Sequence, residues 1–452
     1  MNNWMDAESR VERAHELYQD GRWAEAAAEL SAAIELNPYN ASWKFNLGLT
    51  LEAMGENDRA IEAFYDALEV EPEDLETLNC LGINLTRVGN YADALESFAT
   101  IERLDPSFEP CYCNRIVTYT EMGQHDQAET MFYLARLFKD ECPLCYYNMG
   151  NSYYDRSEYD RAIYCWQKTV EIDPVHPEVH ARLAEAFWAK DDLEQARGHY
   201  EAEIVLNSDQ ADLAGIRLDY GELLMELREF DGAGEQFRMV LEEAPDSASA
   251  HYCLGEMAMR QTNYECAAEQ FQLVQKLDPD YAGIRTKLGK ALLRQGRTGE
   301  AIEHLHAETR SKTKDSGILH ELGELLIEAE DLEEANRVLQ RLVMVAPDDP
   351  YAQHNLAVSY FMLHRMDDGI RHCRKALKLK PDYPLAMYNL ALAHMQKGEI
   401  LRARRYEQKA MTLEPDNTQL RDLSSKLGVP SLWGKLKVRL KPRESRKNQP
   451  EL

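Results

Sequence analysis

A unit of 34 residues repeats along almost the whole chain and limits its possible folds more than any other feature. The segments "FNLGLTLEAMGENDRAIEAFYDALEVEP" (45–72) and "NCLGINLTRVGNYADALESFATIERLDP" (79–106) show two successive copies. Twelve blocks fit, six over 7–210 and six over 214–417, with three extra residues between them. A fixed period of this size predicts a solenoid, because one unit cannot bury its apolar face without neighbours.

Three positions of the block explain the fold of each unit. Position 8 is Gly or Ala in eleven blocks, and only Ile116 departs; position 20 is Ala in eleven, with Gly369 as the exception. Position 32 is Pro in nine blocks and is replaced by Asp140, Ser208 and Thr313 in the others. Small residues allow two antiparallel helices to approach closely, and the proline ends the second helix. Each block therefore predicts a helical hairpin.

This pattern resembles the tetratricopeptide repeat, or TPR, family, and the resemblance covers about 90% of the chain. It implies an all-α, right-handed α-solenoid of about twelve hairpins, with first helices on the concave face and second helices on the convex face. The predicted organisation is a leader (1–6), repeats one to six (7–210), an insertion that could kink the stack (211–213), repeats seven to twelve (214–417), a capping helix (418–428) and a basic amphipathic tail (429–452).

Composition narrows the functional classes. The formal net charge is −28, which argues against broad nucleic-acid binding by the repeats. The chain has no run of 18 apolar residues and no secretory signal, and its nine cysteines favour a reducing compartment, so we expect a cytoplasmic protein. The nucleotide-loop-like stretch "GIRTKLGKA" (283–291) has the wrong glycine spacing, and no other catalytic motif is present. We therefore expect no enzymatic activity, no cofactor and no small-molecule substrate.

Asparagines and aromatic residues are predicted to line the concave face. Carboxamides at position 6, and one at position 9, offer donors and acceptors to an extended peptide backbone, although solvated helix residues would look the same. Aromatic residues at positions 5 and 12 are typical binding anchors, although they could pack between hairpins instead. The candidate peptide-binding residues are Asn46, Asn114, Asn148, Asn151, Asn355, Asn389, Tyr147, Trp188, Tyr252, Phe361 and Tyr388.

Charged residues of the first helices give two further expectations. The middle repeats direct carboxylates inward, and repeat nine alone is basic; its three cations are interpreted as ion-paired to acidic neighbours. Asn151 stands at a position used by TPR domains that hold chaperone C-termini, but Tyr147 stands where that clamp needs lysine. A chaperone C-terminus is therefore not the leading partner. The inward-facing carboxylates of the middle repeats are Glu185, Glu222, Glu256, Glu321, Glu324 and Glu328, and the cations of repeat nine are Lys287, Lys290 and Arg294.

Four cysteines raise the question of a zinc site. Cys111 and Cys113 open repeat four, and Cys142 and Cys145 open repeat five, so their thiolates could gather near one end of adjacent helices. Against this, adjacent first helices are expected about 10 Å apart, which is wider than a tetrahedral site tolerates unless a loop moves. The interpretation as ordinary packing residues is favoured, and no metal site is predicted.

The leading functional hypothesis is a non-enzymatic scaffold or adaptor that binds protein or peptide segments on its concave face. The alternative rests on the tail 429–452, which has seven basic and two acidic side chains. Such a tail could attach an assembly factor to an anionic membrane or nucleic acid, dock on the acidic surface of its own solenoid, or stay mobile.

Overall fold

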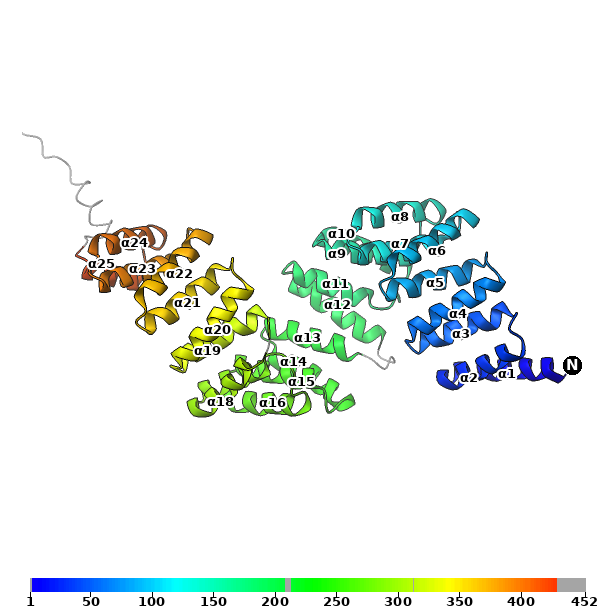
Figure 1. Ribbon diagram of the computed structural model, residues 1–452, viewed down its shortest axis with the longest axis horizontal. Coiled ribbons are helices and arrows are strands. Elements are labelled where there is room, and N and C mark those ends of the chain that lie inside the picture. Colours follow the sequence, from blue (N-terminus) through cyan, green and yellow to red (C-terminus); the bar gives the residue numbers. More distant parts are fainter. Residues whose placement is uncertain (1, 208–212, 312, 429–452) are drawn as a thin grey trace, which may run out of the picture. The chain divides into compact units, whose positions relative to one another are not determined.

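The computed structural model describes residues 2–207, 213–311 and 313–428, and within these ranges every regular element is an α-helix (Figure 1). Twenty-four helices follow one another in the order of twelve hairpins, eleven of which have their two helices packed together, and a twenty-fifth helix comes after them. The predicted all-α repeat fold with a capping helix is thus confirmed. The insertion at 211–213 falls mostly, and the tail 429–452 entirely, outside the described residues.

The chain divides into two compact units, Met1–Ala233 and Gly234–Leu452. The helices of the first unit are α1 (Asn2–Gln19), α2 (Trp23–Leu36), α3 (Ala41–Ala53), α4 (Asn57–Val70), α5 (Leu75–Arg87), α6 (Tyr91–Leu104), α7 (Glu109–Glu121), α8 (His125–Phe138), α9 (Pro143–Asp155), α10 (Tyr159–Ile172), α11 (Val179–Ala189), α12 (Leu193–Leu206) and α13 (Ala214–Glu226). The boundary falls within α14 (Phe230–Glu243).

The second unit continues the same alternation of helices. Its elements are α15 (Ala248–Arg260), α16 (Tyr264–Leu277), α17 (Ile284–Arg294), α18 (Thr298–Thr309), α19 (Ser316–Glu328), α20 (Leu332–Val345), α21 (Pro350–Met362), α22 (Met366–Leu379), α23 (Pro384–Gln396), α24 (Ile400–Leu413) and α25 (Thr418–Lys426). Leu420, Leu423 and Leu427 are buried, which makes α25 the predicted cap on the last hairpin.

The small residue at position 8 is required by a large side chain sixteen residues later. A Cβ built on Gly48 would lie 2.4 Å from the ring of Phe64, and one on Gly150 would lie 2.4 Å from Trp166 Nε1. These rings are completely buried, so the first helix of the hairpin packs its backbone directly on the side chain of the second. The same relation holds at Gly82, Gly255, Gly289 and Gly323.

Each hairpin turn contains one residue in the left-handed conformation, at position 15 of the block. Glycine occupies this position in six repeats, for example Gly55 with φ of 75°. Six other repeats place a side chain there, including the β-branched Thr262 with φ of 61°. Because a Cβ is disfavoured in this region, these turns carry local strain that the glycine turns do not.

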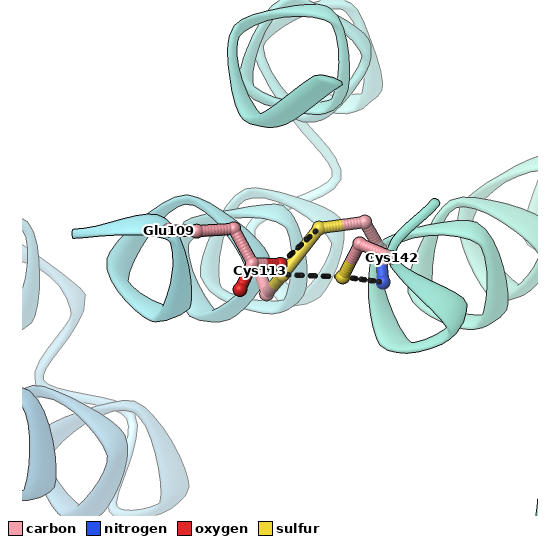
Figure 2. Close-up of side chains that lie close together, drawn as sticks. Glu109, Cys113 and Cys142 are labelled. Atoms are coloured by element: carbon pink, nitrogen blue, oxygen red, sulfur yellow. Dashed lines mark hydrogen bonds between the residues drawn. A yellow bond between two sulfur atoms is a disulfide. The ribbon is translucent and has the colours of Figure 1, made fainter. Parts of the chain in front are cut away.

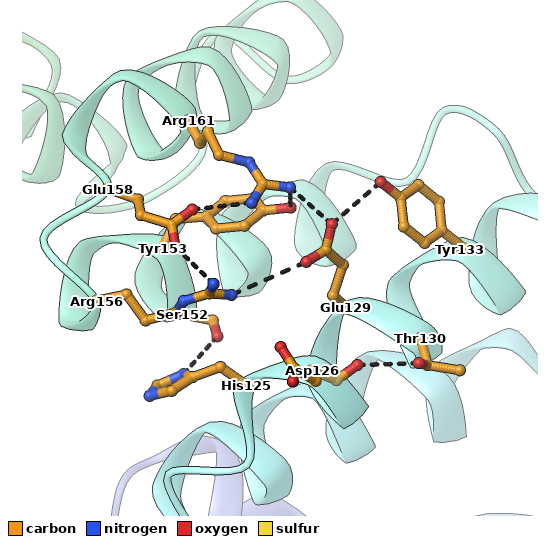
Figure 3. A network of polar contacts seen from close by, with 10 residues as sticks. All are labelled: His125, Asp126, Glu129, Thr130, Tyr133, Ser152, Tyr153, Arg156, Glu158 and Arg161. Carbon is orange, nitrogen blue, oxygen red and sulfur yellow. Dashed lines mark hydrogen bonds and ion pairs between the residues drawn. The ribbon is translucent and has the colours of Figure 1, made fainter.

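Ion pairs also connect the second helices of neighbouring hairpins. Figure 3 shows Arg161 between Glu158 and Glu129, with nitrogen–oxygen distances of 2.8 and 2.6 Å. The guanidinium lies over the ring of Tyr153, 3.9 Å from its centroid. Because Glu129 belongs to α8 and Arg161 to α10, the network links repeats four and five.

Two sequence departures have visible structural consequences. Helix α1 begins at Asn2, so residues 2–6 of the predicted leader are helical; no Gly or Pro precedes Gly21 to interrupt them. Where Thr313 replaces the closing proline, Arg341 donates hydrogen bonds to the carbonyl oxygens of Thr309, Ser311 and Thr313, at 2.7, 2.9 and 3.2 Å.

No helix among the described residues has the length and apolarity to cross a bilayer.

Candidate functional site

Two cavities adjoin on the first helices of repeats four to seven, all within the first unit. The smaller, about 190 Å³, is lined by α7, α9 and α11, with Trp166 of α10, and includes Asn148 and Asn151. The larger, about 460 Å³, includes Glu185, Trp188 and Asp219. Tyr154 lines both cavities, so they lie next to each other. We call this surface the α7–α13 face, defined by Asn148, Asn151, Tyr154, Arg182, Glu185, Trp188, Tyr200 and Asp219.

Two polar atoms in the walls of these cavities lack a hydrogen-bond partner among the described residues. They are Asn151 Oδ1 in the smaller cavity and the hydroxyl of Tyr200 in the larger one. The Tyr200 side chain is buried, and that burial raises the pKa of its hydroxyl. Buried polar atoms are normally paired, so each of these positions favours a partner supplied from outside the chain.

Asp219 makes the larger cavity acidic. Asp219 is exposed to solvent at one side of the cavity, yet its partial desolvation, followed by the nearby carboxylates of Glu185 and Glu222, raises its pKa to about 6. Arg182 opposes this shift but already pairs with Glu185 at 3.0 Å. The aspartate has no ion pair within the described part of the chain, so a cation placed here would relieve repulsion between carboxylates.

The predicted aromatic residues of this region are held in fixed orientations. Trp188 Nε1 donates to Glu226 at 2.6 Å, and its ring stands edge-on to Tyr200 with centroids 6.5 Å apart. The hydroxyl of Tyr147 donates to Glu178 at 3.2 Å. Rings fixed in this way lose little conformational freedom on binding, which suits them as anchors.

Most of the predicted asparagines bridge to the preceding repeat. Asn114 Nδ2 donates to Asn79 Oδ1 at 2.9 Å, and Asn148 Nδ2 donates to the carbonyl of Cys113 at 3.3 Å. In the second unit, Asn355 Nδ2 donates to Glu324 at 2.9 Å, and Asn389 Nδ2 lies 2.9 Å from His354 Nε2. These donors connect adjacent first helices, so Asn151 is the asparagine of the α7–α13 face with an unoccupied acceptor.

The remaining predicted residues lie apart from this face. Asn46 is exposed and lines a separate cavity of about 470 Å³ between α1, α2 and α3. Phe361 and Asn389 line another of about 270 Å³, and Phe361 also packs on Gly369, which explains why glycine replaces alanine there. Tyr252 packs between Phe271 and Tyr281, and Tyr388 packs near the capping helix.

The basic residues of repeat nine are ion-paired, as the sequence predicted. Lys287 Nζ lies 3.4 Å from both Glu256 and Glu321, and Lys290 Nζ lies 2.7 Å from Glu321. Burial alone would raise the pKa of Glu321, but the hydrogen bond from Lys290 and the charge of Lys287 hold it below its usual value. Arg294 pairs with Glu328 in the same row.

The structure brings three of the four noted cysteines together. Cys113 and Cys145 are joined by a disulfide with their Cα atoms 5.0 Å apart, and Cys142 Sγ lies 3.5 Å from Cys113 Sγ. These sulfurs thus lie much closer together than the expected helix spacing of about 10 Å suggested. The reason is local: Cys142 and Cys145 open α9, whose first turn packs against the first turn of α7. Cys111 lies outside the cluster, where burial raises its pKa to about 12.

Sequence reasoning missed Asp219, Arg182, Tyr200 and Glu109, although some signals were present. Asp219 stands at position 6 of repeat seven, the position at which asparagine was noted in five other repeats. Glu109 precedes Cys113 by four residues and therefore shares its helix face. Arg182 and Tyr200 carry no such signal, because their role depends on which neighbouring groups remain unpaired.

Known proteins match the chain as follows. The family model described as tetratricopeptide repeat matches residues 11–74, 218–282, 258–316, 320–384 and 367–418, and a second, described as TPR repeat, matches 150–191. No curated protein matches the sequence. These family models cover more than half of the 452 residues.

Among solved structures, the chain is similar to yeast Tom70, with 15% identity, 96% of both chains covered and a TM-score of 0.45. The APC/C hetero-tetramer Cut9–Hcn1 matches at 13% identity over 93% of this chain and 96% of that chain, with a TM-score of 0.42. YrrB, described as a TPR protein with an unusual peptide-binding site, matches at 19% identity over 42% of this chain and 99% of that one, with a TM-score of 0.37. On the family-model matches, the chain belongs to the tetratricopeptide repeat family.

Proposed function

We propose that the protein is a non-enzymatic scaffold that binds an extended peptide segment with a basic side chain on the α7–α13 face. TPR repeats generally form protein-interaction modules, and the finer assignment rests on this face. The observation that carries it is the carboxylate of Asp219, which has no ion pair among the described residues and lines a cavity beside the one that holds the unpaired Asn151 Oδ1.

Each part of the face has a distinct role in this proposal. Asn151 Oδ1 accepts a hydrogen bond from a peptide N–H, which satisfies an atom that is otherwise buried without a partner. Trp188 and Tyr154 present ring surface to the apolar part of the peptide side chain. Asp219, with Glu185 beside it, receives the ammonium or guanidinium at the end of that side chain.

An array of peptides of equal length that differ only in charge tests this function on the full chain. We expect basic peptides to be retained over neutral and acidic ones, and we expect Asp219→Lys to abolish that preference. Asp66→Lys is the matched control, because Asp66 is exposed on α4 and its replacement changes the net charge by the same amount. Retention of acidic peptides, or equal loss with both variants, would contradict the proposal.

A further inference from the structure

Three cysteine sulfurs and one carboxylate oxygen converge where the first turns of α7 and α9 meet (Figure 2). Glu109 and Cys113 come from α7, Cys142 is the N-cap residue of α9, and Cys145 lies in the first turn of α9. One ligand atom from each residue lies within 4.8 Å of all the others. The three cysteines are buried.

The separations of these atoms match a tetrahedral zinc site. Zinc bonds of about 2.3 Å to sulfur and 2.0–2.2 Å to a carboxylate oxygen place two sulfurs about 3.8 Å apart and a sulfur about 3.5 Å from the oxygen. Cys113 Sγ lies 3.5 Å from Cys142 Sγ, and Glu109 Oε1 lies 3.1 Å from Cys113 Sγ and 3.5 Å from Cys145 Sγ. The bonded pair, Cys113 and Cys145, has to separate to admit the ion.

A disulfide alone accounts for only half of this cluster. It uses two sulfurs, and a hydrogen bond between Cys142 and Glu109 joins the other two groups, but neither contact explains why the carboxylate also lies against the bonded sulfurs. The sulfurs of a disulfide carry no hydrogen, so neither can donate to the Glu109 oxygen that lies against them. A divalent cation between the four groups uses all of them and neutralises part of their charge. We propose that, with the cysteines reduced, Glu109, Cys113, Cys142 and Cys145 bind one structural zinc ion.

The surrounding backbone suits an anionic ligand set. Three thiolates and one carboxylate around zinc leave a net charge of about −2, which must be offset locally. Helix α7 begins at Glu109 and α9 at Pro143, so the positive ends of two helix dipoles lie at the cluster. The backbone N–H of Cys145 already donates to Cys142 Sγ at 3.2 Å, an outer-shell contact that orients this ligand.

Such an ion would clamp two successive first helices together. Asn148 of α9 donates to the Cys113 carbonyl, so the clamp lies next to the wall of the smaller cavity. The zinc site does not depend on peptide binding, and each inference can fail without the other.

Metal analysis of the full chain tests this site. Protein reduced without oxygen, incubated with one equivalent of Zn²⁺ and desalted, should retain about one zinc ion per chain. Cys142→Ala removes one ligand and keeps both cysteines of the disulfide, Cys113 and Cys145. We expect it to lower zinc affinity at least about 100-fold, which is more than the loss caused by an outer-shell change. Cys111→Ala is the matched control, since Cys111 is equally buried nearby but lies outside the cluster.

Co²⁺ in place of zinc reports the ligand set directly. The wild type and Cys111→Ala should show thiolate-to-cobalt charge transfer and tetrahedral ligand-field bands, which Cys142→Ala weakens. Glu109→Gln, which keeps all three thiols, should retain the charge-transfer band while its zinc affinity falls. Helical circular dichroism verifies the folding of each variant. The proposal is overturned if the reduced wild type retains less than about a tenth of an equivalent of zinc, or if folded Cys142→Ala retains as much as Cys111→Ala.

Discussion

The α7–α13 face of the first unit and the α15–α19 face of the second unit place charges at the same repeat positions but treat them differently. In the second unit, Lys287 at position 6 and Lys290 at position 9 lie between Glu256 and Glu321, and every charge has a partner. In the first unit, position 6 of repeat seven is Asp219, with further carboxylates nearby at position 9. The charges of the second unit are paired with one another, whereas Asp219 has no ion pair among the described residues and is the group to which we assign the basic side chain of the peptide.

The pKa shifts express this difference. The charge of Lys287 and the hydrogen bond from Lys290 outweigh burial and lower the pKa of Glu321, so its ionised form stabilises the fold. Desolvation, together with Glu185 and Glu222, raises the pKa of Asp219, so its ionised form is held at a cost. Inward-facing charge is thus found both with and without a partner in the chain, and our proposal assigns peptide binding to the face where the partner is missing.

The largest expected effect on the free energy of unfolding concerns the contact between Gly150 and Trp166, beneath the α7–α13 face. Gly150→Ala places a Cβ 2.4 Å from the rigid indole of Trp166, which also lines the smaller cavity. We expect a loss of about 3 kcal/mol in the free energy of unfolding. In the second unit, the Cβ of Gly289→Ala meets the flexible Leu305 at 2.6 Å, and about 1–2 kcal/mol is expected. Urea denaturation of both variants measures the difference, and equal costs would count against it.

The next largest effect on stability is expected for the ion pairs that Glu321 forms in the second unit. Glu321→Gln leaves Lys287 and Lys290 with less compensation, and we expect a loss of about 1–2 kcal/mol at pH 7. Because the folded pKa of Glu321 is lowered, this difference from the wild type should shrink as the pH falls through that value. Binding of a basic peptide should not change. Reduced peptide binding would show that the second face also takes part.

The fold was predictable because the period and three block positions specify hairpins, as Gly48 with Phe64 illustrates. The pairing of inner-face groups was not, because it depends on how consecutive hairpins rotate against each other. Asn114, for instance, meets Asn79 of the previous repeat. The sequence could in part have predicted Glu109, the carboxylate that joins the three cysteines of the cluster. Residues two apart on a helix face different directions, so Cys111 and Cys113 cannot converge, whereas Glu109 and Cys113 can.

A smaller effect is expected at the hairpin turns, which differ between repeats. Thr262 occupies the left-handed position that Gly55 fills in repeat two. Thr262→Gly should raise the free energy of unfolding by about 0.5–1 kcal/mol, since relief of strain exceeds the added flexibility of the unfolded chain. Thermal melting measures it, with Gly55→Ala as the opposite substitution. A lower melting temperature for Thr262→Gly would contradict the assigned strain.

The smallest stability effect is expected at Asp219 itself. Because its folded pKa is raised, ionisation opposes folding above about pH 6, and Asp219→Asn should leave stability at pH 7 unchanged or slightly higher. This is opposite in sign to Glu321→Gln. A clear loss of stability in the Asp219 variant would mean that the carboxylate has a structural partner within the chain.

The central claim is tested most directly by the affinity of an arginine-containing peptide between pH 8 and 5 at constant ionic strength. Bound cation lowers the pKa of Asp219, so affinity should be full above about pH 6 and decrease below it as the carboxylate is protonated. We expect about a tenfold decrease by pH 5 for the wild type, and a weak, pH-independent affinity for Asp219→Asn. A wild-type affinity that is flat or rises on acidification, or the same profile in both proteins, would contradict the account.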